Sequence, residues 1–201
     1  MDTAAHRSLA YEAAAQSIVM LKHNSQYPAL PLDASKLQRL AMIGPAAAAT
    51  KMLQGNYFGT PPIIVSALEG ITASKGGGKF AVSFAAGCSA ESTNISAGNI
   101  SAAVKVAQSA DATVVVLGVG QTLGGQEGTD RTSIELPQPQ GALVEAVAKA
   151  MRPGPPLVVL VISGELLDID ALAKNPRVGS ILWQGYPSQS GGTVLAQSSA
   201  R

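Results

Sequence analysis

The sequence predicts an α/β fold in which a mostly parallel sheet is covered by helices on both faces. Apolar, β-branched runs of strand length alternate with segments of helical periodicity. Most of these runs end in a Gly-containing or polar loop. Because right-handed crossovers bring the carboxyl ends of parallel strands to one edge, we expect these loops to form a ligand-binding edge.

Composition narrows the class of protein. The 201 residues are 46% hydrophobic and 13% charged, with 14 basic and 13 acidic side chains for a net charge of +1. This balance argues against a nucleic-acid-binding surface. One cysteine and two histidines cannot make a Cys/His zinc site or an internal disulfide. No apolar run reaches the roughly 18 residues of a membrane span, so we expect no metal, membrane or nucleic-acid partner.

The first third of the chain begins with a predicted helix at Thr3–Gln16, which Thr3 or Asp2 can cap. Leu9, Ala10, Ala13 and Ala14 share one face of this helix. The apolar segment Ser17–Lys22 predicts a short buried strand. Prolines then exclude regular structure until Arg39–Ile43, a strand that ends in a Gly-Pro pair.

Beyond this strand the alternation is regular. Apolar runs predict strands, and amphipathic segments predict helices. In order, the expected elements are a helix near Val65–Ala73, strand Lys79–Phe84, helix Ser96–Ser109 with Asn94 or Ser96 as cap, strand Ala112–Val119, helix Gln138–Met151, strand Leu157–Ile162, helix Leu167–Lys174, strand Val178–Trp183 and a helix from Thr193.

The two ends of the chain suggest a longer parent. The first sixteen residues contain His, Arg and Glu and have no apolar segment, which is not the pattern of a signal peptide. The last predicted helix stops within a few residues of Arg201. We therefore expect residues 1–201 to be a single, incomplete domain, truncated at the C-terminus, and the compartment stays open.

The loop 118–137 has the densest polar content. Its opening Gly118-Val119-Gly120 follows a strand, but the spacing does not match G-x-G-x-x-G and no helix begins there, which argues against nucleotide binding. Long loops in compact domains usually carry function. Glu127 lies among glycines, and a carboxylic acid in such a loop suits general-acid catalysis. The alternative is a solvated Glu127 beside a surface pair, Asp130 and Arg131.

Other polar residues offer weaker candidates. Glu165 and Asp168 follow another strand and are the best intrachain candidates for a second carboxylate, although Asp168 also suits a helix cap. Ser163 lies in VISGE, which is not G-x-S-x-G, so a serine hydrolase is not indicated.

Two adjacent aromatics, Tyr57 and Phe58, lie between Gly55 and Gly59 in a loop predicted at the same edge. They fit two interpretations equally. They could form a stacking platform for a sugar ring, or one of them could anchor its loop to the core. Trp183, at a strand end, is expected in the core.

Several motifs, in order, resemble the C-terminal α/β sandwich domain of glycoside hydrolase family 3, which contains β-xylosidases and β-glucosidases. The forms GNYFGTPP and EGTDR resemble the xylosidase-type branch most. The matching segments are AAAQSIVMLK (13–22), AMIGP (41–45), LQGNYFGT (53–60), SADATVVVLG (109–118), QEGTDR (126–131) and ILWQGYPSQSGG (181–192).

The resemblance implies retaining hydrolysis of a terminal β-xyloside or β-glucoside without a cofactor. In the family an N-terminal (β/α)₈ barrel, absent from this chain, carries the nucleophilic Asp. The E-G-x-D-R motif falls on residues 127–131, which gives Glu127 the general acid/base role. By the same match, Asp130, Arg131 and Tyr57 would contact substrate. The expected partners are a β-linked xylo- or gluco-oligosaccharide and a barrel domain in cis or in trans.

The sequence departs from the family pattern in three places. Gly120 stands where an Asp is usual, Gly124-Gly125-Gln126 replaces the first Glu with one extra residue, and Cys88 lacks the second cysteine that often follows. A second hypothesis therefore stays open, in which the chain is a non-catalytic carbohydrate-binding or interaction module left from such an enzyme. An independent Rossmann-like nucleotide binder would need a phosphate loop, which the sequence lacks.

Overall fold

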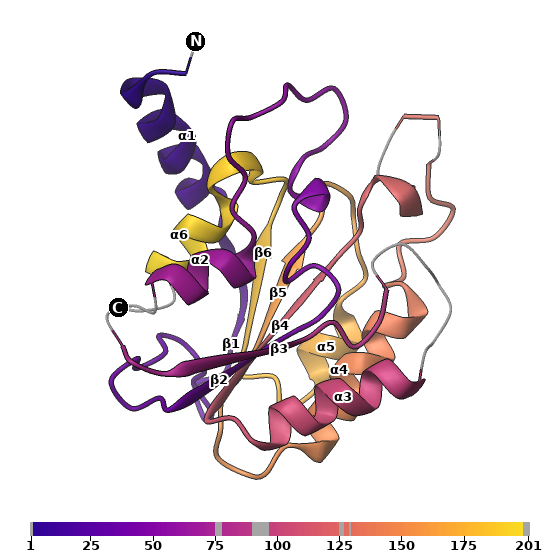
Figure 1. Ribbon diagram of the computed structural model, residues 1–201. Coiled ribbons are helices and arrows are strands. Elements are labelled where there is room, and N and C mark those ends of the chain that lie inside the picture. Colours follow the sequence, from indigo (N-terminus) through magenta and orange to yellow (C-terminus); the bar gives the residue numbers. More distant parts are fainter. Residues whose placement is uncertain (1, 75–77, 90–96, 125–126, 129, 199–201) are drawn as a thin grey trace.

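The computed structural model describes residues 2–74, 78–89, 97–124, 127–128 and 130–198. Its centre is a six-stranded sheet in the order β1-β6-β5-β4-β2-β3 (Figure 1). The five strands from β2 onward are parallel, and β1 is antiparallel to β6. The strands are β1 (Val19–His23), β2 (Arg39–Ile43), β3 (Ala81–Ala85), β4 (Ala112–Gly118), β5 (Leu157–Ile162) and β6 (Ser180–Gln184). The predicted fold class is confirmed.

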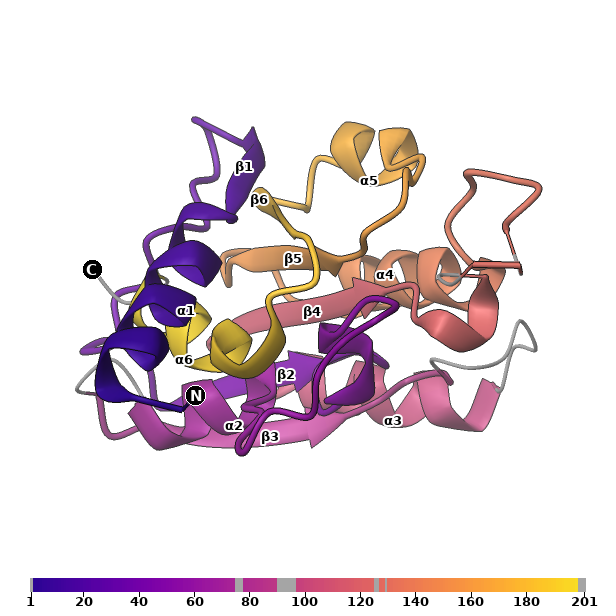
Figure 2. The same ribbon diagram turned by 90° about the horizontal axis from the view of Figure 1, so that it is seen from above.

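Helices cover both faces of this sheet (Figures 1 and 2). Side chains of α2 and α6 pack into the buried cluster on one face, and side chains of α3, α4 and α5 pack into the cluster on the other. The helices are α1 (Ala4–Gln16), α2 (Ala67–Ser74), α3 (Ala97–Gln108), α4 (Gln138–Ala150), α5 (Asp170–Lys174) and α6 (Gly191–Ser198). The caps expected for α3, Asn94 and Ser96, lie outside the described residues.

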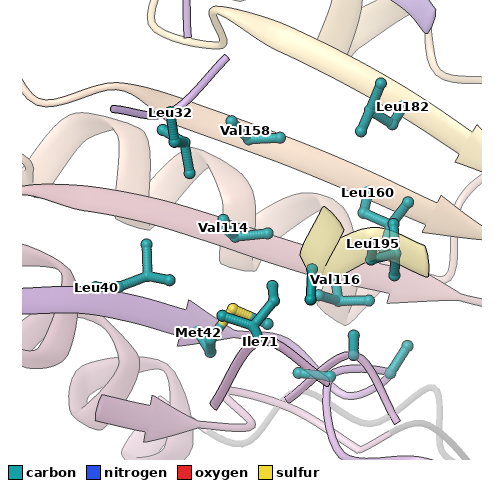
Figure 3. Packing of buried hydrophobic residues seen from close by; sticks show 14 of the residues in the cluster. Leu32, Leu40, Met42, Ile71, Val114, Val116, Val158, Leu160, Leu182 and Leu195 are labelled. Atoms are coloured by element: carbon teal, nitrogen blue, oxygen red, sulfur yellow. The ribbon is translucent and has the colours of Figure 1, made fainter. Parts of the chain in front are cut away.

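The core of the first face is aliphatic and spans the central strands (Figure 3). It joins Met42, Val116 and Leu160 from three strands to Ile71 of α2 and Leu195 of α6. In β4 and β5 every residue is buried, because both faces of these strands are covered. This explains why their sequences are continuous apolar runs rather than alternating ones.

One predicted strand differs from expectation. The segment Ser17–Lys22 was expected to be buried, but β1 begins at Val19 and is mostly exposed; Met20 is 51% accessible. β1 is the edge strand, so it has a neighbour on one side only, and its pairing with β6 is interrupted between Met20 and Lys22. An apolar run indicates a strand, but it does not reveal how many neighbours the strand will have.

The strand order reverses between β2 and β4. From β2 the chain passes through α2 on one face to β3, whereas from β4 it passes through α4 on the other face to β5. The loops that follow β2 and β4 therefore diverge at the carboxyl edge of the sheet. Such a reversal is where open α/β sheets bind ligands.

The loop after β2 crosses closely over β4. Gly44, with φ of 108°, ends β2, and a Cβ added there would lie 2.1 Å from the carbonyl oxygen of Val116. Ala46 N donates to that same oxygen at 3.2 Å. Only glycine allows this approach and this backbone angle. The close contact fixes the beginning of the loop after β2 against strand β4.

Candidate active-site edge

The loops after β2, β4, β5 and β6 lie at the carboxyl edge of the sheet, toward the top of Figure 1, as the β–α alternation predicts. The loop after β2 carries Tyr57, and the loop after β4 carries Glu127, Asp130 and Arg131. The two loops that diverge at the strand reversal thus carry Tyr57, Glu127, Asp130 and Arg131, whereas Glu165 and Asp168 follow β5. The roots of the two loops are in contact, because Gln121 Nε2 donates to Gly55 O at 2.7 Å.

Tyr57 lies in the open at this edge. Its side chain is 83% exposed, and its φ of 58° places the backbone in the left-handed region. Phe58 is also exposed. Neither ring is buried in the core, so neither anchors its loop there, and the stacking platform stays a prediction.

Glu127 and Asp130 are both exposed on the long loop, whereas Arg131 is partly buried. Gly124 and Gly128 have φ of 102° and 81°, so the backbone on either side of Glu127 uses conformations that favour glycine.

Arg131 fastens the far end of this loop. Its Nη2 donates to the carbonyl oxygen of Glu135. Its Nη1 is buried and has no partner among the described residues. Glu135 in turn forms a single parallel bridge with Asp168, whose N–H donates to Ile134 O at 2.7 Å. Asp168 Oδ1 also accepts from Asp170 N at 2.9 Å, but the N-cap of α5 is Ile169, one residue later than the cap expected from the sequence.

The near end of the loop is fastened by Gln140, a residue that sequence reasoning missed. This side chain, fully buried at the start of α4, accepts from Gly118 N at 2.9 Å and donates to Gly118 O at 2.7 Å. One side chain therefore joins the residues on both sides of the loop. The signal that could have found it is a glutamine at a core-facing position of an amphipathic helix.

Tyr186, which follows β6, packs among three loops of this edge. A Cβ added at Gly55 or at Gly164 would lie 2.8 or 2.3 Å from the Tyr186 ring, so both residues must be glycine. The Tyr186 hydroxyl donates to Val119 O at 3.4 Å. Burial raises the pKa of Tyr186, which keeps the hydroxyl protonated as a donor.

In the part of the chain that the structure describes, no group of three or more His, Cys, Asp and Glu side chains is placed to hold a metal ion. No described helix is long and apolar enough to cross a membrane. Cys88 is a buried free thiol, and burial raises its pKa to about 11.

With this geometry established, the comparisons with known proteins define the class. The family model described as "Glycosyl hydrolase family 3 C-terminal domain" matches residues 18–198. The chain belongs to this family. It is a domain of the type found in family 3 β-xylosidases and β-glucosidases, with the α/β fold of that domain.

Particular relatives agree. The chain is 40% identical over 195 residues to "Beta-xylosidase/alpha-L-arabinofuranosidase 2" of Medicago sativa subsp. varia, covering 96% of this chain and 24% of the relative. It is 39% identical over 188 residues to "Probable exo-1,4-beta-xylosidase xlnD" of Aspergillus japonicus, covering 94% and 22%. The chain thus spans about a quarter of the length of these curated relatives.

Solved structures show the same fold. A GH3 exo-β-xylosidase, XlnD, in complex with a xylobiose aziridine activity-based probe superposes with a TM-score of 0.85 at 35% identity, covering 98% of this chain and 24% of that one. A GH3 β-glucosidase of Bifidobacterium adolescentis superposes with a TM-score of 0.84 at 28% identity, covering 100% and 27%.

Proposed function

We propose that this chain supplies the general acid/base, Glu127, to the active site of a retaining β-glycosidase that hydrolyses terminal β-linked xylose or glucose. The observation that carries the proposal is the position of Glu127. It is exposed, flanked by Gly124 and Gly128, and lies on one of the two loops that diverge at the strand reversal. Membership of the family supports the reaction class.

The reaction assigns Glu127 two opposite proton transfers. First, the Glu127 carboxylic acid donates its proton to the glycosidic oxygen while a carboxylate nucleophile bonds to the anomeric carbon and the alcohol leaves. Then the Glu127 carboxylate takes a proton from water as the water oxygen displaces the nucleophile. The second carboxyl must lie about 5–5.5 Å from the first.

We assign the nucleophile to a (β/α)₈ barrel that covers this edge in cis or in trans. Large apolar side chains exposed on the same edge support a covering partner: Leu166 is 83%, Ile63 61% and Ile134 57% exposed. They come from loops after three different strands. A barrel that covers this edge would remove these apolar side chains from water.

A second candidate function rests on Tyr57 and Phe58. Two exposed aromatics on one loop are also what a non-catalytic sugar-binding module would present. The two functions are distinguished by chemistry, because such a module binds sugar without any need for Glu127.

The test is a chimera in which residues 1–201 replace the matching segment of the XlnD exo-β-xylosidase, whose fold superposes over 98% of this chain. We expect xylobiose hydrolysis, and a fall in kcat of about 10²–10⁴-fold in Glu127→Gln. Glu145→Gln, an exposed carboxylate on α4, is the matched control. A chimera whose unfolding temperature shows that it is folded, but whose turnover is indifferent to Glu127→Gln, contradicts the proposal.

A further inference from the structure

Two glutamine amides fasten the loop that carries Tyr57. Gln121 Nε2 donates to Gly55 O at 2.7 Å and lies 3.5 Å from Gln54 O. The buried Gln54 side chain in turn donates through Nε2 to Gly59 O at 3.2 Å. The segment 55–59 is therefore held at its beginning by Gln121 and closed at its end by Gln54.

Tyr186 restricts the same point from another direction. Its ring lies against Gly55, close enough that a Cβ there would be 2.8 Å from Cδ2, and its hydroxyl donates to Val119 O. Gly55 is thus in contact with both the Tyr186 ring and the Gln121 amide. Both contacts lead to the loop after β4, because Val119 and Gln121 lie at its root.

Gln121 therefore lies in the loop after β4 and holds the loop after β2 through its hydrogen bond to Gly55 O. It opens the short helix η3 (Gln121–Leu123), which ends at the left-handed Gly124, three residues before Glu127. Through Gly55 it reaches Tyr57, whose left-handed backbone costs about 1–2 kcal/mol and persists only where neighbouring contacts hold it. Sequence reasoning did not single out this residue.

We propose that Gln121 is a positioning residue that sets the place of Tyr57 relative to Glu127 when a sugar occupies the edge. The inference rests on the proposed function. It assigns to Gln121 the recognition of the leaving sugar, whose ring stacks on Tyr57, and not the proton transfer itself. Misplacement by about 1 Å can cost about 10²-fold in rate.

The test uses Gln121→Met in the chimera, because methionine keeps the length, removes the N–H donor and adds no charge beside Glu127. We expect kcat/KM for xylobiose to fall about tenfold or more, mostly through KM. For xylosyl fluoride, whose leaving group has no ring, we expect a change within about twofold. Gln108→Met, which removes a single amide contact to Ala150 O at the end of α3, is the matched control.

A double-variant comparison separates positioning from general stability. In a Tyr57→Ala background, Gln121→Met should change kcat/KM for xylobiose by less than about twofold, because the residue through which Gln121 acts is gone. Equal losses on both substrates, or additive losses in the double variant, overturn the inference while leaving the Glu127 proposal intact.

If the chimera is inactive, the inference can still be tested by a measurement that does not depend on catalysis. In the chain of residues 1–201, ¹⁵N relaxation should show residues 55–59 more mobile in Gln121→Met than in Gln108→Met. Unchanged relaxation of residues 55–59 overturns the inference whatever the fate of the proposed function.

Discussion

At the scale of single residues, Asp111 connects three parts of the chain beside the amino end of the sheet. Its Oδ2 accepts from Arg39 N at 2.8 Å and Gln38 N at 2.9 Å, and its Oδ1 lies 3.3 Å from Arg152 Nη2. The backbone hydrogen bond from Arg39, then that from Gln38, hold the pKa of the Asp111 carboxyl below its ordinary value of 3.8. The ionised carboxylate therefore stabilises the folded state.

We expect Asp111→Asn to lower the free energy of unfolding by about 1 kcal/mol at pH 7. Because the folded pKa is depressed, this contribution is complete above about pH 4 and is lost as pH falls through the folded pKa. Urea unfolding at pH 7 and at pH 2 measures this contribution to the free energy of unfolding. The control is Asp170→Asn, which removes an exposed ion pair with Lys174. A difference between wild type and Asp111→Asn that is as large at pH 2 as at pH 7 contradicts this account.

The sequence singled out the candidate site residues but not the residues that hold their loops, and the assignment of Glu127 and Tyr57 to a ligand stays a prediction. Glu127 and Tyr57 stand out because glycines surround them. Gln121 and Gln54 do not stand out, because an amide side chain in a loop has no turn or helix signature. The role of Gln121 depends on the backbone carbonyl of Gly55 in another loop, and no local pattern encodes which loops will meet.

At the scale of elements, α2 and α6 cross with glycines at the contact. A Cβ added at Gly192 would lie 1.9 Å from Ser66 O, and one added at Gly70 would lie 2.0 Å from Gly192 O. Gly192 N also donates to Val65 O at 2.9 Å. The two helices can cover one face of the sheet together only because neither has a side chain at this point.

We expect Gly192→Ala to destabilise the fold by about 2 kcal/mol or more, because the helices must separate from the core they cover. Gly141→Ala in α4 is the matched control, since nothing lies within 4 Å of its added Cβ. That substitution should stabilise by about 0.5–1 kcal/mol through helix propensity. Thermal unfolding of both variants measures the two changes in stability. Equal changes in Gly192→Ala and Gly141→Ala would refute the close contact between α2 and α6 as the cause.

The elements themselves were well predicted where both faces of a strand are covered. The expected bounds Arg39–Ile43 and Leu157–Ile162 coincide with β2 and β5, because continuous apolar runs are specific for such strands. The order of the strands was not predictable from these runs. The antiparallel edge position of β1 and the reversal between β2 and β4 depend on pairings between distant segments.

At the scale of the whole molecule, we expect the chain by itself to have no glycosidase activity. A general acid without a nucleophile and without a pocket that orients the bond lacks the covalent and positioning contributions to the rate. We expect residues 1–201 to hydrolyse aryl β-xylosides and β-glucosides no faster than the buffer does. Turnover that disappears in Glu127→Gln would show that the chain carries its own second carboxyl.

The most direct measurement of the central claim is the dependence of the Glu127→Ala chimera on the leaving group. A general acid matters most when the leaving group is poor. We predict a loss of about 10²–10⁴-fold on xylobiose, a far smaller loss of the first step on dinitrophenyl β-xyloside, and partial rescue of the second step by azide, which needs no general base. If Asp130→Asn shows this pattern and Glu127→Ala does not, Asp130 is the acid and the account of this loop is wrong.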